Sequence, residues 1–168
     1  MKKQLLLVLL FISTLGLVGC GAYSFTGGNV GNAKTIQVDY FPNQAALVEP
    51  QLSPLFTQEL QDLFIRQTSL SLVPSGGDLR FEGEITRYRV NPMSATSQQT
   101  AAQNRLTVSI NVRFFNRLKP EDDFEKQFSF YSDFAADAQL TGSVLDAALA
   151  EILDRLTQDI FNSSVGKW

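Results

Sequence analysis

The sequence of 168 residues contains no histidine and a single cysteine, Cys20. Without histidine, the chain lacks the commonest general base and the commonest metal ligand of proteins. With one thiol it cannot form an internal disulfide, so the fold must be held together by the packing of side chains. The spacing of the remaining polar residues singles out no catalytic pair and no metal cluster. We therefore predict that the protein is not an enzyme and binds no metal.

Long hydrophobic runs are also scarce. The apolar stretch Leu5–Val18 covers 14 residues, which falls short of the roughly 20 that are needed to span a bilayer. Lys2 and Lys3 precede this stretch and the small residue Gly19 follows it, which is the pattern of a secretory signal peptide. We predict that residues 1–19 are cleaved and that the mature protein leaves the cytoplasm. An uncleaved membrane anchor is the alternative that the short run disfavours.

The end of this run, Leu17-Val18-Gly19-Cys20, resembles the bacterial lipobox. In that motif the cysteine sulfur receives a diacylglycerol, the chain is cut before the cysteine, and the new amino terminus is acylated. We therefore predict Cys20 as a lipid attachment site that carries a diacylglycerol and an N-acyl chain, with no other cofactor. Several acyl chains anchor a protein stably, because each buried CH2 contributes about 0.8 kcal/mol. An ordinary signal peptide that ends at cysteine is the alternative interpretation.

Basic residues are outnumbered, with 14 Lys and Arg against 17 Asp and Glu. Removal of Lys2 and Lys3 with the signal peptide leaves 12 basic residues and a net charge of −5. An acidic chain of this kind is not expected to bind nucleic acid or anionic membranes broadly. The remaining 149 residues are a natural size for one domain. We predict a lipidated, glycine-rich tether over residues 20–33 and a single domain over residues 34–168.

Five segments predict strands, because apolar and polar residues alternate along them. They are Lys34–Phe41, residues 70–73, residues 79–90, residues 106–114 and residues 124–134. In the first strand, Ile36, Val38 and Tyr40 are expected on the buried face.

The long third strand changes its pattern part of the way along. Ile85 and Tyr88 lie at opposite parities, although both are expected to face the core. A β-bulge near Thr86 or Arg87 would keep the apolar side inward on both sides of this point. The connection over residues 91–103 has no apolar period, so it is either a loop or a continuation of the two strands it joins.

Two amphipathic helices are predicted. The first covers Pro54–Gln67, with Ser53 as its N-cap and proline at the first helical position. The second begins after Ser143, which together with Asp146 resembles a capping box. Both helices show apolar residues at three- and four-residue spacing along one side only.

These elements predict a two-layer α+β fold, with a small mixed sheet, two helices on one face, and the order β-α-β-β-β-β-α along the chain. Both helices are expected on the same face, because each has a single apolar stripe to bury. The other face is expected to be polar and to carry Arg80, Glu82, Glu84, Thr107, Ser109, Asn111 and Arg113. Such a surface is either simply solvated or suited to meet the polar interior of another protein.

The order of several short stretches is similar to that in a known family, the lipopolysaccharide (LPS) assembly lipoproteins LptE. The stretches are Cys20-Gly21-Ala22-Tyr23-Ser24-Phe25, Ile36–Asn43, Leu55-Phe56-Thr57, residues 77–85, Asn104-Arg105-Leu106-Thr107, and residues 159–162 with Trp168. The resemblance implies a small sheet covered by two helices. It also implies a plug inside the lumen of the outer-membrane β-barrel LptD, which helps the barrel assemble and helps LPS reach the outer leaflet.

The resemblance therefore implies an LptD-type barrel and LPS as partners, together with the membrane through the lipid anchor. It implies a lipid-anchored protein of the outer membrane, on its periplasmic side or inside the barrel lumen. LPS phosphates call for arginine or lysine donors. Arg87, Arg89 and Arg105 are candidates, because the predicted hairpin brings them together; solvated charges at a strand edge are the alternative.

Two other functions remain open at this point. A stand-alone periplasmic lipoprotein could bind an apolar or glycolipid ligand, for which it would need a cavity between sheet and helices. A hydrolase would need polar residues that converge in a cleft. The acidic run Glu121-Asp122-Asp123 lacks the spaced ligands and the glycine of a calcium loop, so a solvated turn is expected there.

Replacement of Cys20 by alanine is expected to release the protein from the membrane without unfolding it, because the residue serves as an anchor and not as part of the core. Cell fractionation measures the release, and circular dichroism of the purified variant measures the folding. A Cys20→Ala variant that cannot fold in soluble form would contradict the separation of tether and domain.

Overall fold

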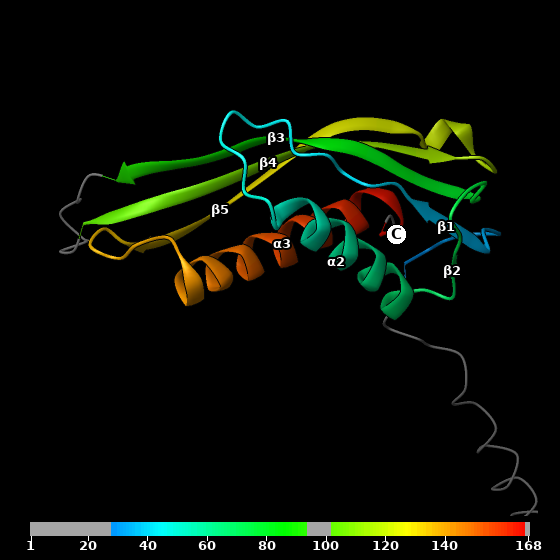
Figure 1. Cartoon of the computed structure of the whole chain (residues 1–168). Helices are drawn as coiled ribbons and strands as arrows, with labels where there is room; N and C mark the ends of the chain where they lie inside the picture. Colours follow the sequence, from blue (N-terminus) through cyan, green and yellow to red (C-terminus); the bar gives the residue numbers. More distant parts are fainter. Residues whose placement is uncertain (1–27, 94–101, 167–168) are drawn as a thin grey trace, which may run out of the picture.

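The computed structural model describes residues 28–93 and 102–166. Its elements are β1 (Thr35–Val38), α2 (Leu52–Gln67), β2 (Ser71–Leu72), β3 (Leu79–Met93), β4 (Gln103–Asn116), a short 3-10 turn (Pro120–Asp122), β5 (Phe124–Ala135) and α3 (Gly142–Ser164). The five strands form one sheet in the order β2-β1-β3-β4-β5, and both helices lie on the same side of it (Figure 1). The predicted two-layer α+β fold is confirmed.

The sheet is mixed because of where β1 lies. This short strand pairs in parallel with both β2 and β3, so that α2 is the connection between two parallel neighbours. The three long strands β3, β4 and β5 form an antiparallel meander. Because β4 has 14 residues, its two ends lie about 44 Å apart. The sheet is therefore elongated, with β1 and β2 at one end and the last pair of the β3–β4 hairpin, Met93 and Gln103, at the other (Figure 1). We call this second end the hairpin tip.

The predicted bulge in β3 is confirmed. The register between β3 and β4 shifts between Ile85 and Arg87, which leaves Thr86 as the extra residue. Ile85 and Tyr88 are consequently both buried, although their parity differs. The pairing of the hairpin extends as far as Met93 and Gln103, so the start and the end of the predicted connection continue the two strands, which is one of the two alternatives for this segment. Residues 94–101 lie outside the described residues.

The core contains a continuous row of aromatic rings between the two layers. Phe64 of α2 lies 4.9 Å from Phe81 of β3 and 5.0 Å from Phe161 of α3, measured between ring centroids. Phe81 in turn lies 4.8 Å from Phe114 of β4. Aromatic pairs at such spacing stabilise a core beyond the area they bury. The row therefore joins both helices to the middle of the sheet.

A second aromatic contact depends on a glycine. Phe41 packs edge-on against Phe56 of α2, with 4.9 Å between ring centroids. The Phe41 ring lies against Gly83 of β3, where a Cβ atom would come within 2.7 Å of ring atom Cε1 and would also clash with the Asn111 carbonyl oxygen. Glycine is needed there because no other residue leaves room for Phe41.

The sequence interpretation was wrong about Tyr40, which is 62% exposed, whereas the next residue, Phe41, is fully buried. Strand β1 ends at Val38, and the alternation ends with it. The chain continues along β3 by irregular contacts: Asp39 N–H donates to the Phe81 carbonyl oxygen, and the Pro42 carbonyl oxygen accepts from Ile85 N–H.

Both predicted helix caps were also wrong. α2 begins at Leu52, so Ser53 lies inside the helix, where it is 2% exposed and its hydroxyl has no hydrogen-bond partner among the described residues. Burial of this first turn against the sheet outweighed the capping preference of serine. α3 begins at Gly142, whose φ of +52° suits glycine, and its N-cap is Thr141 without a side-chain hydrogen bond. Ser143 therefore follows the start of the helix.

The entry of the chain into the domain is tied down at two points. Asn29 N–H donates to the Val165 carbonyl oxygen, at the C-terminal end of α3. The Asp78 carboxylate accepts from Lys34 N–H, Thr35 N–H and the Thr35 hydroxyl. These hydrogen bonds lower the pKa of Asp78 below its ordinary value. Residues 29–33 were predicted as part of the tether; the structure places Ala33 in the core.

Replacement of Phe81 by alanine is expected to lower the free energy of unfolding by about 3–5 kcal/mol, because it leaves a cavity in the middle of the aromatic row. Chemical denaturation followed by circular dichroism measures the change. Tyr40→Ala is the matched control, since this ring is exposed and a change of less than about 1 kcal/mol is expected. Equal losses for the two variants would show that the aromatic row does not hold the layers together.

Candidate functional site: the open face of the sheet

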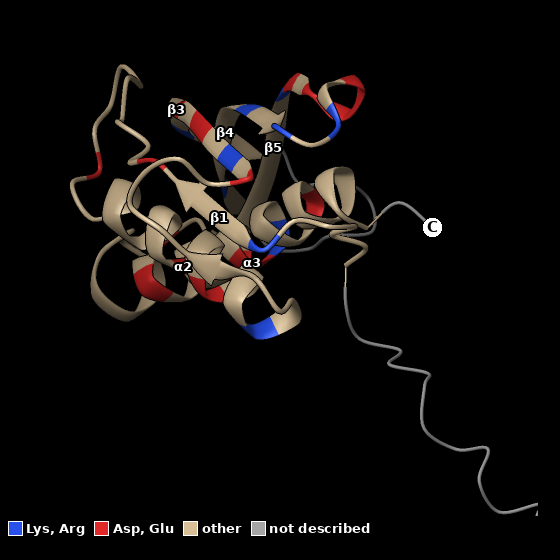
Figure 2. Cartoon of the chain, turned by 90° about the vertical axis from the view of Figure 1, so that its right-hand side faces the viewer, with Lys and Arg blue, Asp and Glu red and all other residues tan. Residues whose placement is uncertain are grey.

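The sheet face opposite α2 and α3, which we call the open face, is polar as predicted. Its side chains come from three strands: Arg80, Glu82, Glu84, Arg87 and Arg89 of β3; Arg105, Thr107, Ser109, Asn111 and Arg113 of β4; and Glu125, Gln127, Ser129, Tyr131 and Asp133 of β5. Acidic and basic residues are interspersed on β3 and β4 (Figure 2). The face is therefore a candidate surface for contact with a polar partner.

Arg113 of β4 is the centre of an ionic network near the β4–β5 turn. Its guanidinium donates to Glu82 at 3.0 Å and to Glu84 at 3.0 Å, and these two carboxylates raise the Arg113 pKa. Asn111 donates to Glu84 at 3.0 Å and to Glu125 of β5 at 2.8 Å. The network therefore crosses three strands. It holds the side chains of this half of the face in fixed positions.

Arg80 extends the same network toward β1. Its Nη2 atom lies 2.7 Å from an Asp39 carboxylate oxygen, and this hydrogen bond is the main cause of a raised Arg80 pKa. Arg80 also forms an ion pair with Glu82. Single ion pairs that are partly exposed contribute little to stability. The main effect of this ion-pair network is to hold its charged side chains in a fixed arrangement.

Arg105 anchors the other half of the face. It makes a two-pronged contact with Asp133 of β5, with Nε at 2.7 Å from one carboxylate oxygen and Nη2 at 2.8 Å from the other. Its guanidinium also lies 3.5 Å above the centre of the Tyr131 ring. The hydrogen bond from Arg105 lowers the pKa of Asp133. Arg105 is therefore held by its own neighbours.

Arg87 and Arg89 differ from the other arginines of the open face in their lack of a carboxylate partner within the described ranges. Both are exposed, and no hydrogen bond or ion pair to either of them is found within the described ranges. The segment 94–101 supplies no carboxylate to pair with them, because it contains only Ser, Ala, Thr and Gln. Arg89 lies opposite Thr107, one step along the face from Arg105, so the three arginines predicted to be neighbours do share one part of the surface.

The open face is consequently polarised along its length. Near the β4–β5 turn, two arginines meet four carboxylates, those of Asp39, Glu82, Glu84 and Glu125. Toward the hairpin tip, three arginines meet the single carboxylate of Asp133. The sequence interpretation missed Asp133 and Tyr131. Both alternate with Phe128 and Phe130 along the strand, so the same pattern that faces these phenylalanines toward the helices would have placed Tyr131 and Asp133 on the opposite face, with Arg105.

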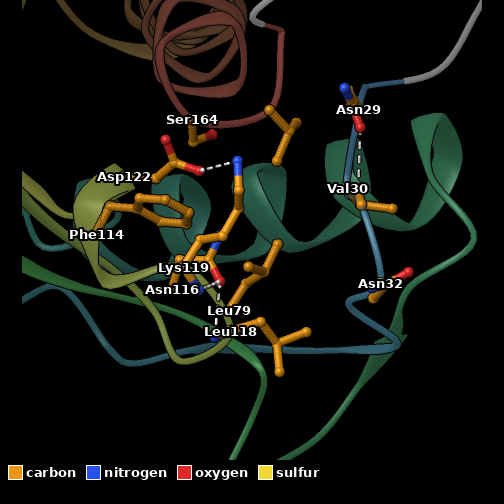
Figure 3. A pocket seen from close by; sticks show the side chains of 12 residues that line it. Asn29, Val30, Asn32, Leu79, Phe114, Asn116, Leu118, Lys119, Asp122 and Ser164 are labelled. Atoms are coloured by element: carbon orange, nitrogen blue, oxygen red, sulfur yellow. Dashed lines mark hydrogen bonds and ion pairs between the residues drawn. The ribbon is translucent and has the colours of Figure 1, made fainter.

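A cavity of about 350 Å³ lies away from this face, at the end of the sheet that holds the chain entry (Figure 3). Leu79, Phe114 and Val30 contribute apolar walls, and Lys119 pairs with Asp122 at 3.6 Å on its rim. A second cavity of about 410 Å³ lies between α2 and α3. The first cavity lies between the sheet, at Leu79 and Phe114, and the C-terminal end of α3, at Ser164. The second is lined by the two helices alone.

Two further observations concern the predicted anchor and metals. Cys20 lies outside the described residues, so its role stays a prediction. In residues 28–93 and 102–166 no helix is long and apolar enough to cross a bilayer. The same residues contain no group of three or more Asp or Glu arranged to hold a metal ion.

Comparison with known proteins supports both the fold and a family. The model of the family described as "LptE: Lipopolysaccharide-assembly" matches residues 33–164. A search of the curated proteins finds no match. Among solved structures, the hypothetical protein CT253 from Chlamydia trachomatis is similar at 12% identity and a TM-score of 0.52, over 76% of this chain and 93% of that one. This likeness supports the architecture alone.

Two bacterial lipoproteins of known structure are also similar. A minor lipoprotein from Acinetobacter baumannii is 9% identical with a TM-score of 0.49, over 77% of this chain and 91% of its own. The rare lipoprotein B from Shewanella oneidensis is 10% identical with a TM-score of 0.40, over 76% and 89%.

Proposed function

The chain belongs to the LptE lipopolysaccharide-assembly family, and from this we propose that it is an outer-membrane lipoprotein that partners a β-barrel of LptD type in the transport of LPS to the outer leaflet. The family match carries the proposal. It extends from residue 33 to residue 164 and so includes every helix and strand of the described structure, from β1 to α3.

The dimensions of the domain support a place inside the barrel. The chain enters at the end of the sheet that holds β1, where residues 29–32 lie beside the β4–β5 turn. The tip of the β3–β4 hairpin lies at the opposite end, about 44 Å away along β4. The hydrocarbon core of a bilayer is about 30 Å thick. A domain anchored through Cys20 at one leaflet is therefore long enough to reach the level of the other.

The chemistry of the open face supports the same place. Barrels of the outer membrane have a polar interior that is filled by water or by a plug. The open face offers a hydrogen-bonded array of charged and amide side chains, centred on Arg113 and Asn111, which suits contact with such a wall. In this position the lipidated Cys20 anchors a non-catalytic partner beside its barrel.

We assign the LPS phosphates to Arg87 and Arg89. These two side chains have no protein partner in the described ranges, so their donors are available to a phosphate. Arg105 is already engaged with Asp133 in two hydrogen bonds. Its role is to keep a third positive charge next to the other two. The proposal therefore gives Arg87 and Arg89 direct contacts with the phosphates and gives Arg105 a supporting role.

The alternative function, a stand-alone lipoprotein that binds an apolar or glycolipid ligand, would use the cavity in Figure 3. That cavity combines apolar walls with the amides of Asn29, Asn32 and Asn116. One wall of this cavity is formed by residues 29–32, where the chain enters the domain. The alternative therefore predicts ligand binding by the purified domain with no barrel present.

Purification from membranes tests the proposal directly. The full-length protein, tagged at its C-terminus and extracted in a mild non-ionic detergent, is expected to bring down one large β-barrel in a one-to-one ratio. Size-exclusion chromatography with mass spectrometry identifies the partner and the ratio. Recovery of the protein as a free monomer would contradict the proposal and leave the ligand-binding alternative.

Replacement of the two free arginines is expected to weaken LPS binding. Loss of a charged hydrogen bond costs about 1.5–3 kcal/mol, so Arg87→Gln and Arg89→Gln should each raise the Kd for LPS by a factor of about 10 to 100. Isothermal titration calorimetry of the full chain in detergent measures the Kd. Arg66→Gln removes the same charge from α2, where Arg66 pairs with Glu59, and should leave the Kd unchanged. An equal effect of all three variants would point to net charge and not to a site.

A further inference from the structure

The sheet has three stretches of edge, and two of them are short or shielded. The β2 edge has only two residues. β3 has no strand beside it beyond Phe81, but Asn43 bridges to Ile85 and Gln44 N–H donates to the Ile85 carbonyl oxygen. Further along, Pro92 interrupts the β3 edge. Short strands, covering loops and prolines are the usual ways in which proteins protect a sheet edge.

The third edge, that of β5, has none of these devices. β5 has 12 residues without proline or glycine, and its register with β4 is unbroken from Phe124 to Ala135. The hydrogen bond from Ala136 N–H to the Ala102 carbonyl oxygen fixes the phase of this ladder. In an antiparallel ladder, hydrogen-bonded and non-bonded residue pairs alternate along the strands. The backbone N–H and C=O groups of the even-numbered β5 residues therefore bond to β4, whereas those of the odd-numbered residues point away from the sheet.

The outward residues are therefore Glu125, Gln127, Ser129, Tyr131 and Asp133, the same residues whose side chains lie on the open face. No backbone hydrogen bond reaches their N–H or C=O groups from another element within the part of the chain that the structure describes. These groups recur at every second residue, about 6.7 Å apart. Another extended backbone matches that spacing.

We propose that the outer edge of β5 binds an extended segment of a partner protein, which adds to the sheet as a sixth strand. The inference rests on the proposed function, since the partner is the barrel protein. Strands of a closed barrel have all their backbone groups paired, so the added strand comes from a loop or a terminal segment of that protein. Strand addition of this kind supplies main-chain hydrogen bonds, while side chains on each face give specificity.

The two faces of β5 define the side chains of the added strand. On the helix side, Phe124, Phe130 and Phe134 are half-buried and pack against the core, and Lys126 lies over the Phe128 ring. The strand therefore presents apolar residues there, except next to Lys126.

On the open side, β5 carries Glu125, which is largely exposed, and Asp133, which is paired with Arg105. The strand therefore presents a neutral or basic residue opposite Glu125. Apolar residues at alternate positions, with a neutral or basic residue opposite Glu125, identify the segment.

A second copy of this chain fits less well than a different protein. Antiparallel pairing of two β5 strands about Ser129 joins nearly their full length. That arrangement places Glu125 of each copy opposite Asp133 of the other, on the open face. Like charges that lie directly opposite one another destabilise a strand pair. A partner strand without carboxylates avoids this repulsion.

One substitution tests the edge without touching the core. Gln127→Pro removes an outward N–H at the middle of the exposed edge, a position where proline is tolerated because no ladder bond to β4 is lost. Gln127→Ala loses the same side chain, including its hydrogen bond to Thr86, but keeps the N–H. Circular dichroism checks that both variants melt at the temperature of the wild type.

The variants are then expressed in full length and purified from membranes. Gln127→Pro should recover at least about tenfold less barrel than Gln127→Ala, as expected for loss of a strand pairing, because the two variants share the loss of the side chain and differ at the outward N–H. Hydrogen–deuterium exchange of the wild type should show slower exchange at residues 125–133 in the complex than in the isolated chain. If the proline variant does not fold, this exchange measurement on the wild type tests the strand addition by itself.

The outcomes separate the two proposals. If the wild type brings down no barrel, the proposed function fails and the strand addition fails with it. If Gln127→Ala and Gln127→Pro bring down equal amounts of barrel, and exchange at residues 125–133 is unchanged in the complex, strand addition is overturned and the function stands. A species with the mass of two chains and no barrel would establish the second copy as the occupant and overturn the proposal.

Discussion

The arrangement of the whole molecule depends on one extra residue in β3. Side chains of a strand alternate between the two faces of the sheet, so a strand without the bulge at Thr86 would send Tyr88 and Val90 outward and turn Arg87 and Arg89 toward the helices. The bulge exchanges the two faces for the residues that follow it. It lies directly after Ile85, which Asn43 contacts as the last residue of the irregular segment after β1 to pair with β3. Beyond it, the strand keeps an apolar side against the core and presents two cations on the open face.

The consequence of this geometry is electrostatic. Before the bulge, the carboxylates of β3 are neutralised by Arg113 of β4, which lies between Glu82 and Glu84, and by Arg80 of β3 itself. After the bulge, the charge of β3 changes sign, and the one nearby carboxylate, Asp133, is taken by Arg105. A protein with a net negative charge thus carries a local excess of positive charge at one end of one face. Under the proposal that Arg87 and Arg89 contact LPS phosphates, the lipid would approach that end although the protein as a whole is negatively charged.

Long-range periodicity made most of the fold predictable. The 23 residues of α3 and the long strands β3, β4 and β5 repeat their apolar pattern often enough to be recognised, and the change of parity around Thr86 located the bulge. The failures were local. Ser53 and Ser143 are residues that favour helix caps, but burial of Ser53 and the backbone of Gly142 decided where the helices begin. The contact between Arg105 and Asp133 joins residues 28 positions apart, and only the strand register reveals it.

The hydrogen bonds at the chain entry, those of Asn29 and of the Asp78 carboxylate, also affect how the domain responds to mechanical load. Under the proposal that Cys20 carries a lipid, the domain would be pulled at its N-terminus whenever its membrane and its proposed partner moved apart. The pull enters at residues 28–35, where Asn29 is bonded to the end of α3 and the Asp78 carboxylate grips Lys34 and Thr35. Behind them, β1 is paired on both sides in parallel, so the force acts along the strand and shears several hydrogen bonds together. The sheet is thereby protected from being unzipped one bond at a time.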